Sequence, residues 1–362
     1  MMTWLHRSAA CALSLHAQVQ STGLENVPLF FEFLDAYRLR WRDLRLVLPF
    51  SWARVAIHIL DRPTPLLEVL RMRVAKSHDN LLPVPEISFL LTDISAPHLR
   101  YLCWGITGPN RVRFLPQLSR LEDLDVDYEI SVTECLDILQ QCLGLVSCEF
   151  WRIKIVQSDA AKLNSRCIIT HPRLRSFSLH STVVTDLLLE YLTLPALIKL
   201  KVAVIRDTST QIPNTWSQPR FNSFFARSAP PLQHLILQDA LPSEEALIQC
   251  LECVSVSLIE LIVLDTDGIF VMRDGVLALL TVRQDGDGHA TCLCPRLEAL
   301  RFGRSLLSTD GLLADMVESR WRRTWPDTIA RLRSINPCIS ITDHPNDVRR
   351  LTTLRDKGLH WS

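Results

Sequence analysis

Residues 230–237 read Pro-Pro-Leu-Gln-His-Leu-Ile-Leu, and residues 257–264 read Ser-Leu-Ile-Glu-Leu-Ile-Val-Leu. Counted from the first leucine of each phrase, the first, fourth and sixth residues are apolar. If the phrase forms a strand, the fourth and sixth residues point to the same face. Between the phrases, Ser243 precedes two acidic residues and an apolar pattern spaced at three and four, which predicts a helix over 244–254 with Ser243 as N-cap. Strand, helix and strand at this pitch predict parallel strands, because a tight turn cannot join parallel neighbours.

The same phrase occurs ten times along the chain, at intervals of 22 to 39 residues between successive first positions. We call its three apolar positions the anchors. They are Trp41/Leu44/Leu46, Leu67/Leu70/Met72, Leu99/Leu102/Trp104, Leu121/Leu124/Val126, Leu145/Cys148/Phe150, Leu174/Phe177/Leu179, Leu197/Leu200/Val202, Leu232/Leu235/Leu237, Leu258/Leu261/Val263 and Leu297/Leu300/Phe302.

Proline supports this frame independently, because it stands two residues before the first anchor in six of the ten units. With 20 prolines in 362 residues, this is far more than chance would place there. Proline cannot continue a helix and favours extended geometry nearby, so it ends each helix and begins each strand. The six are Pro65, Pro97, Pro172, Pro195, Pro230 and Pro295.

The predicted fold class is α/β: a leucine-rich-repeat solenoid, or horseshoe, of parallel strands with helices on the convex side and about ten to twelve irregular repeats. The expected organisation is an N-terminal capping strand and helix (1–40), the solenoid (41–305) and a C-terminal repeat or cap (306–362). Residues 76–96 and 206–218 are expected to be loops. In the C-terminal cap we expect a strand over 329–335 and a helix over 347–357, with Asn346 as N-cap and Gly358 after its end.

Composition excludes several classes of function. The 39 basic and 39 acidic residues balance, so neither a nucleic acid nor a membrane is expected as a partner. No run of 18 apolar residues occurs. The 11 cysteines are odd in number and spread along the chain, which favours reduced thiols and a cytoplasmic or nuclear location. The first 17 residues faintly resemble a signal peptide, but the alternation of Leu13 and Leu15 with polar residues predicts a strand.

Several motifs resemble the F-box and leucine-rich-repeat proteins of mushroom-forming fungi. They are the opening Trp4-Leu5-His6-Arg7-Ser8, the segment Arg40-Trp41-Arg42-Asp43-Leu44-Arg45-Leu46, the recurring Pro-x-Leu-x-x-Leu and the late Met316-Val317-Glu318-Ser319-Arg320-Trp321. The resemblance covers the whole chain. It implies that the repeats capture a protein substrate, while an F-box helix bundle binds a Skp-type adaptor of a cullin ubiquitin ligase.

The chain departs from that plan at its N-terminus. An F-box would begin with a Leu-Pro-x-Glu-Ile-like phrase, and the first 40 residues contain none. Residues 82–87 (Leu-Pro-Val-Pro-Glu-Ile) resemble it but are expected to form a loop. Two interpretations follow: the F-box is missing from this sequence, or the chain is a relative without one. The leading hypothesis is a protein-binding module that recognises substrate for an F-box-type ligase, and the alternative is a ligase-independent scaffold.

The partner is expected on the concave face, at strand positions that alternate with the anchors. These positions form three zones. The first is basic, with Arg45, Arg71 and Arg73. The second is acidic with a tryptophan, and the third is apolar. The predicted partner-binding residues of the second and third zones are Asp125, Asp127, Glu149, Trp151, Ile236, Gln238, Ile262 and Leu264.

A hypothesis of another class is a zinc-binding or enzymatic protein that uses Cys250, Cys253, His289 and Cys292, with Cys294 nearby. The spacing argues against it, because Cys250 and Cys253 fall on a helix whose buried stripe requires apolar residues. Residues 285–289 begin like a calcium loop, but Arg296 stands where that loop needs a glutamate. No phosphate loop, nucleophile elbow or metalloprotease motif occurs. We therefore expect no enzymatic activity, no catalytic residue and no cofactor or metal.

Overall fold

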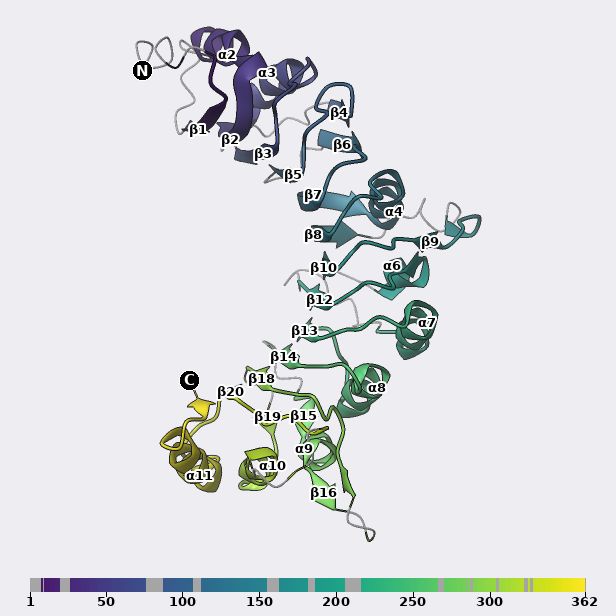
Figure 1. Cartoon of the computed structure of the whole chain (residues 1–362), viewed down its shortest axis with the longest axis vertical. Helices are drawn as coiled ribbons and strands as arrows, with labels where there is room; N and C mark the ends of the chain where they lie inside the picture. Colours follow the sequence, from purple (N-terminus) through teal and green to yellow (C-terminus); the bar gives the residue numbers. More distant parts are fainter. Residues whose placement is uncertain are drawn as a thin grey trace. The chain divides into compact units, whose positions relative to one another are not determined.

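The computed structural model describes residues 8–361 apart from 9, 20–26, 76–86, 107–111, 155–162, 182–185, 206–215, 266–269, 285, 287–288, 304–305, 322–324 and 326–327. The chain forms two compact units, Met1–Leu174 and Arg175–Ser362. Both are mixed α/β structures built on parallel strands, with helices along one side of the strands (Figure 1). Of the F-box-like residues 82–87, residues 82–86 lie outside the described part and Ile87 begins a strand.

Six described strands of the first unit form a parallel sheet in the order β1-β2-β3-β5-β7-β8. Their bounds are β1 Leu13–Gln18, β2 Trp41–Pro49, β3 Val69–Ala75, β5 Tyr101–Ile106, β7 Asp123–Ser131 and β8 Ser147–Lys154. The helices are α2 Val27–Ala36, α3 Phe50–Leu60 and α4 Val132–Gln141. Two further parallel strands, β4 Ile87–Thr92 and β6 Val112–Gln117, pair with each other and contact α3 and α4 respectively.

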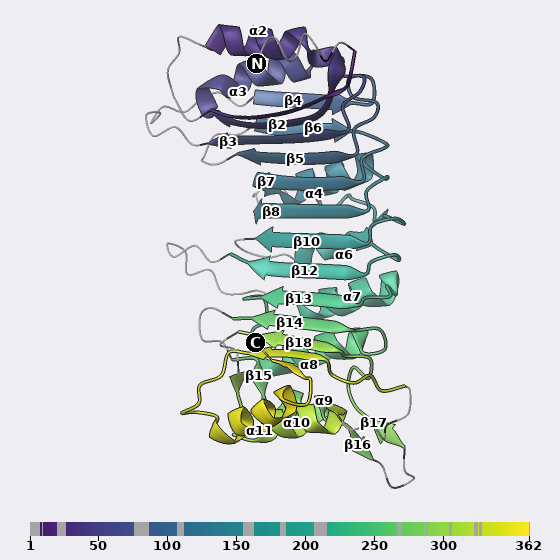
Figure 2. The same cartoon turned by 60° about the vertical axis from the view of Figure 1, so that its left-hand side comes forward.

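In the second unit seven described strands run in the order β10-β12-β13-β14-β18-β20-β21. Figure 2 shows β10 to β18 following one another in this order. They are β10 Ser176–Ser181, β12 Lys199–Val204, β13 His234–Gln238, β14 Glu260–Leu264, β18 Ala299–Phe302, β20 Ser334–Pro337 and β21 His360–Trp361. The helices are α6 Asp186–Glu190, α7 Gln218–Ser228, α8 Glu244–Val254, α9 Asp274–Leu280, α10 Leu312–Trp321 and α11 Pro345–Arg355. Each of these helices contacts the next along the chain.

The anchors form the core of both units. All thirty are no more than 2% exposed. The strand residues between them lie on the opposite face of the sheet, which we call the open face. The predicted alternation of the anchors is therefore confirmed. The opposite face is more exposed in most strands, although Cys103 of β5 and Ser178 and His180 of β10 are buried there too.

A backbone pattern follows the anchors. The carbonyl of the residue after the first anchor accepts two N–H groups from the next unit of the repeat: Glu68 O, for example, accepts from Arg100 N at 2.9 Å and Tyr101 N at 3.1 Å. Because the pattern uses only main-chain atoms, it is independent of the side chain at that position. The same arrangement occurs at the carbonyls of Arg100, Glu122, Arg175, Ile198, Gln233, Ile259 and Glu298.

Most of the predicted elements are present. The predicted N-terminal strand is β1, which pairs in parallel with β2. Ser243 caps α8 by accepting a hydrogen bond from Ala246 N. Gly358 follows α11 with φ of 103°, a left-handed conformation that glycine adopts without steric cost.

Four local predictions were wrong. The N-cap of α11 is His344 rather than Asn346, because Pro345 occupies the first turn and proline is suited to that place. The last predicted strand begins later, as β20 at Ser334. Strand β4 lies inside the expected loop 76–96, where pairing with β6 stabilises it. Helix α7 begins at Gln218, the last residue of the other expected loop, whose residues 206–215 lie outside the described part.

Candidate protein-binding surface

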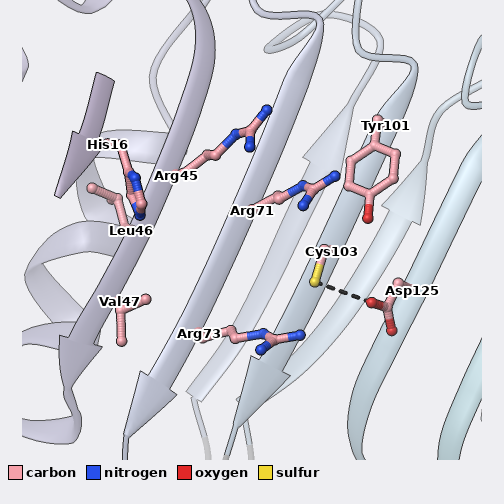
Figure 3. A pocket seen from close by; sticks show the side chains of 9 residues that line it. All are labelled: His16, Arg45, Leu46, Val47, Arg71, Arg73, Tyr101, Cys103 and Asp125. Carbon is pink, nitrogen blue, oxygen red and sulfur yellow. Dashed lines mark hydrogen bonds between the residues drawn. The ribbon is translucent and has the colours of Figure 1, made fainter. Parts of the chain in front are cut away.

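The basic zone of the first unit lines a pocket on the open face. Arg45 on β2 is the register partner of Arg71 on β3, and Arg73 follows two residues later on the same face. With Tyr101, Cys103 and Asp125 on the neighbouring strands, and His16, Leu46 and Val47 on β1 and β2, these arginines line a pocket of about 350 Å³ (Figure 3). We call it the arginine pocket.

The three arginines differ in their surroundings. Arg45 donates two hydrogen bonds to Asp43, at 3.0 and 2.8 Å, and these bonds raise the pKa of Arg45. The guanidinium of Arg71 lies over the ring of Tyr101, 4.5 Å from its centroid, as a cation–π pair. Figure 3 shows Arg73 directed toward Asp125 on the far side of the pocket.

Asp125 forms the far wall, and both of its carboxylate oxygens accept hydrogen bonds. Trp151 Nε1 donates to Oδ1 at 2.8 Å, and the Cys103 thiol donates to Oδ2 at 3.3 Å. Burial raises the pKa of Asp125. Burial and the nearby Asp125 also raise the pKa of Cys103 to about 12, so this thiol stays protonated and serves as a donor. The structure thus brings together Asp125 and Trp151, two residues predicted as one zone.

Part of the acidic zone is neutralised within the sheet. Asp127 pairs with Arg152 of β8 at 3.0 Å, and Glu129 pairs with Lys154 at 2.6 Å. Glu149 is the register partner of Asp125. The zone therefore carries less free negative charge than its sequence indicates, because basic residues of β8 lie beside the acids of β7.

The apolar zone lies on the open face of the second unit. Ile236 and Ile262 are register partners on β13 and β14, as are Gln238 and Leu264. Basic residues flank the isoleucines, because Lys201 aligns with Ile236 and Arg301 aligns with Ile262.

A cross-strand pair lies beside these isoleucines, in which His234 Nδ1 is 2.8 Å from Glu260 Oε2. All eight predicted partner-binding residues are half-buried, neither enclosed in the core nor fully exposed.

Two residues of the arginine pocket, Tyr101 and His16, were not among the predicted positions. Tyr101 precedes the anchor Leu102, and strand alternation places it on the open face with Cys103. The position before the second anchor is thus a third outward position in each strand. His16 belongs to β1, outside the ten predicted units, and aligns with Arg45.

The four residues of the zinc hypothesis do not form a cluster in the described part of the chain. The thiols of Cys250 and Cys253 contact the side-chain oxygens of Gln218 and Asn222 on α7, and burial raises the pKa of both. Cys292 accepts a hydrogen bond from Arg320. His289 is exposed and lies outside α8, the helix that carries Cys250 and Cys253.

Arg320 on α10 is a buried cation of the second unit and is only 1% exposed. Its guanidinium donates to three main-chain carbonyls: Leu280 at 2.8 Å, Leu293 at 2.7 Å and Cys294 at 3.1 Å. Burial lowers its pKa, while the thiols of Cys292 and Cys294 oppose that shift. Arg320 thereby holds the end of α9 and the segment before β18 against α10.

One group of possible metal ligands, Asp310, His344 and Asp347, is found among the described residues. Its atoms already have protein partners. Asp310 accepts hydrogen bonds from the main-chain N–H groups of Asn346 and Asp347. Asp347 accepts from Ala314 N at 2.7 Å and lies 3.1 Å from His344 Nδ1. This arrangement caps α11 and joins it to α10, which accounts for the residue types without a metal ion.

None of the described helices has the length and apolar character needed to cross a membrane. No protein-family model matches the chain, and no curated protein matches it either.

Proposed function

We propose that the chain is a protein-binding module and that its open face is the recognition surface. The observation that carries this proposal is the arrangement of the open face. Parallel strands with fully buried anchors hold charged, aromatic and apolar side chains in fixed neighbouring registers. Such rigid arrays reduce the entropy lost on binding, because the side chains are positioned before the partner arrives.

The apolar pair Ile236 and Ile262 is the proposed energetic centre in the second unit. Both side chains are half-buried at adjacent positions, and Lys201 and Arg301 flank them. An apolar contact surrounded by polar residues is the usual layout of a hot spot. A partner with an apolar side chain beside acidic groups fits this surface.

The finer proposal is that this module recognises substrates for an F-box-type ubiquitin ligase. Its support is the sequence resemblance in Trp4–Ser8, Arg40–Leu46 and Met316–Trp321. Affinity purification of the tagged chain from its own cells, with mass spectrometry, tests it. Recovery of a Skp-type adaptor and a cullin supports the ligase role. Specific recovery of other proteins without them contradicts that role and favours a ligase-independent scaffold.

The module itself is tested with a partner recovered in that experiment and purified. The double variant Ile236→Asp with Ile262→Asp places two charges in the apolar zone, and we expect it to weaken binding by tenfold or more. The matched control is Val256→Asp with Ile341→Asp, which changes two exposed apolar residues outside the zone, 82% and 70% exposed. Circular dichroism should be unchanged in both. Equal binding by the two double variants would show that the apolar zone is not used.

A further inference from the structure

The arginine pocket concentrates like charge in a way that a sheet does not favour by itself. Arg45 and Arg71 are side by side on adjacent strands, and Arg73 is two residues from Arg71. Adjacent strands lie about 4.8 Å apart and residues i and i+2 about 6.6 Å apart, so the three side chains start within reach of one small anion. Like charges at such positions destabilise a sheet. The cluster is therefore best satisfied by a counter-charge.

The protein supplies that counter-charge only in part. Arg45 is neutralised by Asp43, with two hydrogen bonds. Within the described ranges, neither Arg71 nor Arg73 forms a salt bridge with a carboxylate. Arg71 stacks on a neutral ring. Arg73 contacts the Cys103 thiol and is attracted by Asp125, whose two oxygens already accept bonds from Trp151 and Cys103. Two guanidinium groups thus keep most of their five N–H donors for another acceptor.

We propose that the arginine pocket binds one anionic side chain, phosphorylated or carboxylate, of a protein segment lying on the open face of the first unit. This inference rests on the proposed function and names the chemistry of the ligand. The planar guanidinium fork matches both phosphate and carboxylate oxygens, and charge-assisted bonds of this kind are about twice as strong as neutral ones.

The charge of the arginine pocket differs from one side to the other. Arg45 and Arg71 lie on one side and Asp125 on the other (Figure 3). An anion seated between Arg71 and Arg73 is attracted, whereas a second anion toward β7 meets the carboxylate of Asp125. The site therefore selects a single anionic residue over a run of them, and favours a neutral or basic residue on the β7 side.

The test uses fluorescein-labelled degenerate peptide pools with a fixed central phosphoserine, phosphotyrosine, glutamate or serine, titrated with the full chain at physiological salt and followed by fluorescence polarisation. We expect at least one anionic pool to bind tenfold or more tightly than the serine pool. Arg71→Gln with Arg73→Gln should lower that affinity about tenfold or more, because it removes charge-assisted bonds. Arg71→Lys with Arg73→Lys keeps the charge without the fork and should be intermediate.

The matched control is Arg54→Gln with Arg100→Gln, which removes the same charge from two exposed arginines that do not line the pocket. It should bind as the unchanged protein does. Comparison of the phosphorylated pools with the glutamate pool identifies the source of the anion, and inorganic phosphate should compete only if phosphate itself is recognised.

Equal binding of the serine and anionic pools, binding of no pool at all, or equal loss in the two double glutamine variants would overturn the inference. The proposed function is decided separately by partner binding to the Ile236→Asp, Ile262→Asp protein. A partner that loses affinity there, while the Arg71→Gln, Arg73→Gln protein binds it normally, would leave the binding module intact without an anion site.

Discussion

Replacing the buried Arg320 by methionine should destabilise the second unit strongly. Methionine retains most of the apolar stem but has no donor, so the carbonyls of Leu280, Leu293 and Cys294 lose their partner. A hydrogen bond from a charged donor contributes about 1.5 kcal/mol or more net, so the loss of three gives about 4.5 kcal/mol or more. Removing a buried cation recovers some desolvation energy, which places the expected loss at about 3–4 kcal/mol.

Urea unfolding followed by circular dichroism measures this loss, and hydrogen exchange at α9 and α10 locates it. Arg320→Lys should cost less, because an ammonium group still reaches one or two of the carbonyls. Arg301→Met, an exposed change on β18, should stay within about 0.5 kcal/mol of the unchanged protein. If Arg320→Met costs less than about 1 kcal/mol, water or a relaxed backbone satisfies those carbonyls and Arg320 does not hold the three segments together.

Two further predictions concern the capping of a helix and the state of the thiols. Ser131 and Glu134 form a capping box at the start of α4, so Ser131→Ala should lower the free energy of unfolding by about 1 kcal/mol in urea titration; an unchanged midpoint would contradict this. Iodoacetamide at pH 8 should label the exposed Cys167 and leave Cys103 and Cys294 unmodified in peptide mapping, because burial raises the pKa of both buried thiols to about 12. Rapid labelling of Cys103 in the folded protein would refute its placement. Since these raised pKa values favour the protonated thiols of the folded form, the free energy of unfolding should fall as pH rises above the ordinary thiol pKa of 9.0 toward about 12.

Sequence periodicity predicted the core well, because the anchors report directly which residues a parallel strand must bury. The anchors Trp41 and Trp104, at most 1% exposed, show that even very large side chains obey the frame. Helices and strands whose own sequence carries a weak capping or alternation pattern were harder to predict. Helix α3 was not predicted, since Pro49 rather than a serine or aspartate stands at its N-cap and no side chain caps it. Strand β4 depends on its pairing with β6, which no local pattern reveals.

For the candidate surface, the sequence predicted which residues lie on the open face but not which of their side chains contact each other across strands. Alternation placed Arg45, Arg71 and Asp125 on one face, and the structure has them there. The Cys103 and Trp151 bonds to Asp125 depend on register between strands more than 20 residues apart in sequence. The same holds for the pairing of Asp127 with Arg152. The sequence therefore shows which charged residues the open face carries. It does not show which of them form ion pairs across strands, because that depends on the register.

The paired N–H groups accepted by the carbonyl after eight of the ten first anchors have a consequence for how such a chain changes over evolutionary time. The joint between successive turns requires an amide hydrogen and a carbonyl, so it tolerates any side chain other than proline at the donor positions. Glutamate, arginine, isoleucine and glutamine all occupy the acceptor position here. Outward residues can therefore diverge while the buried anchors and the main-chain joint keep the scaffold, which lets recognition change without a change of fold.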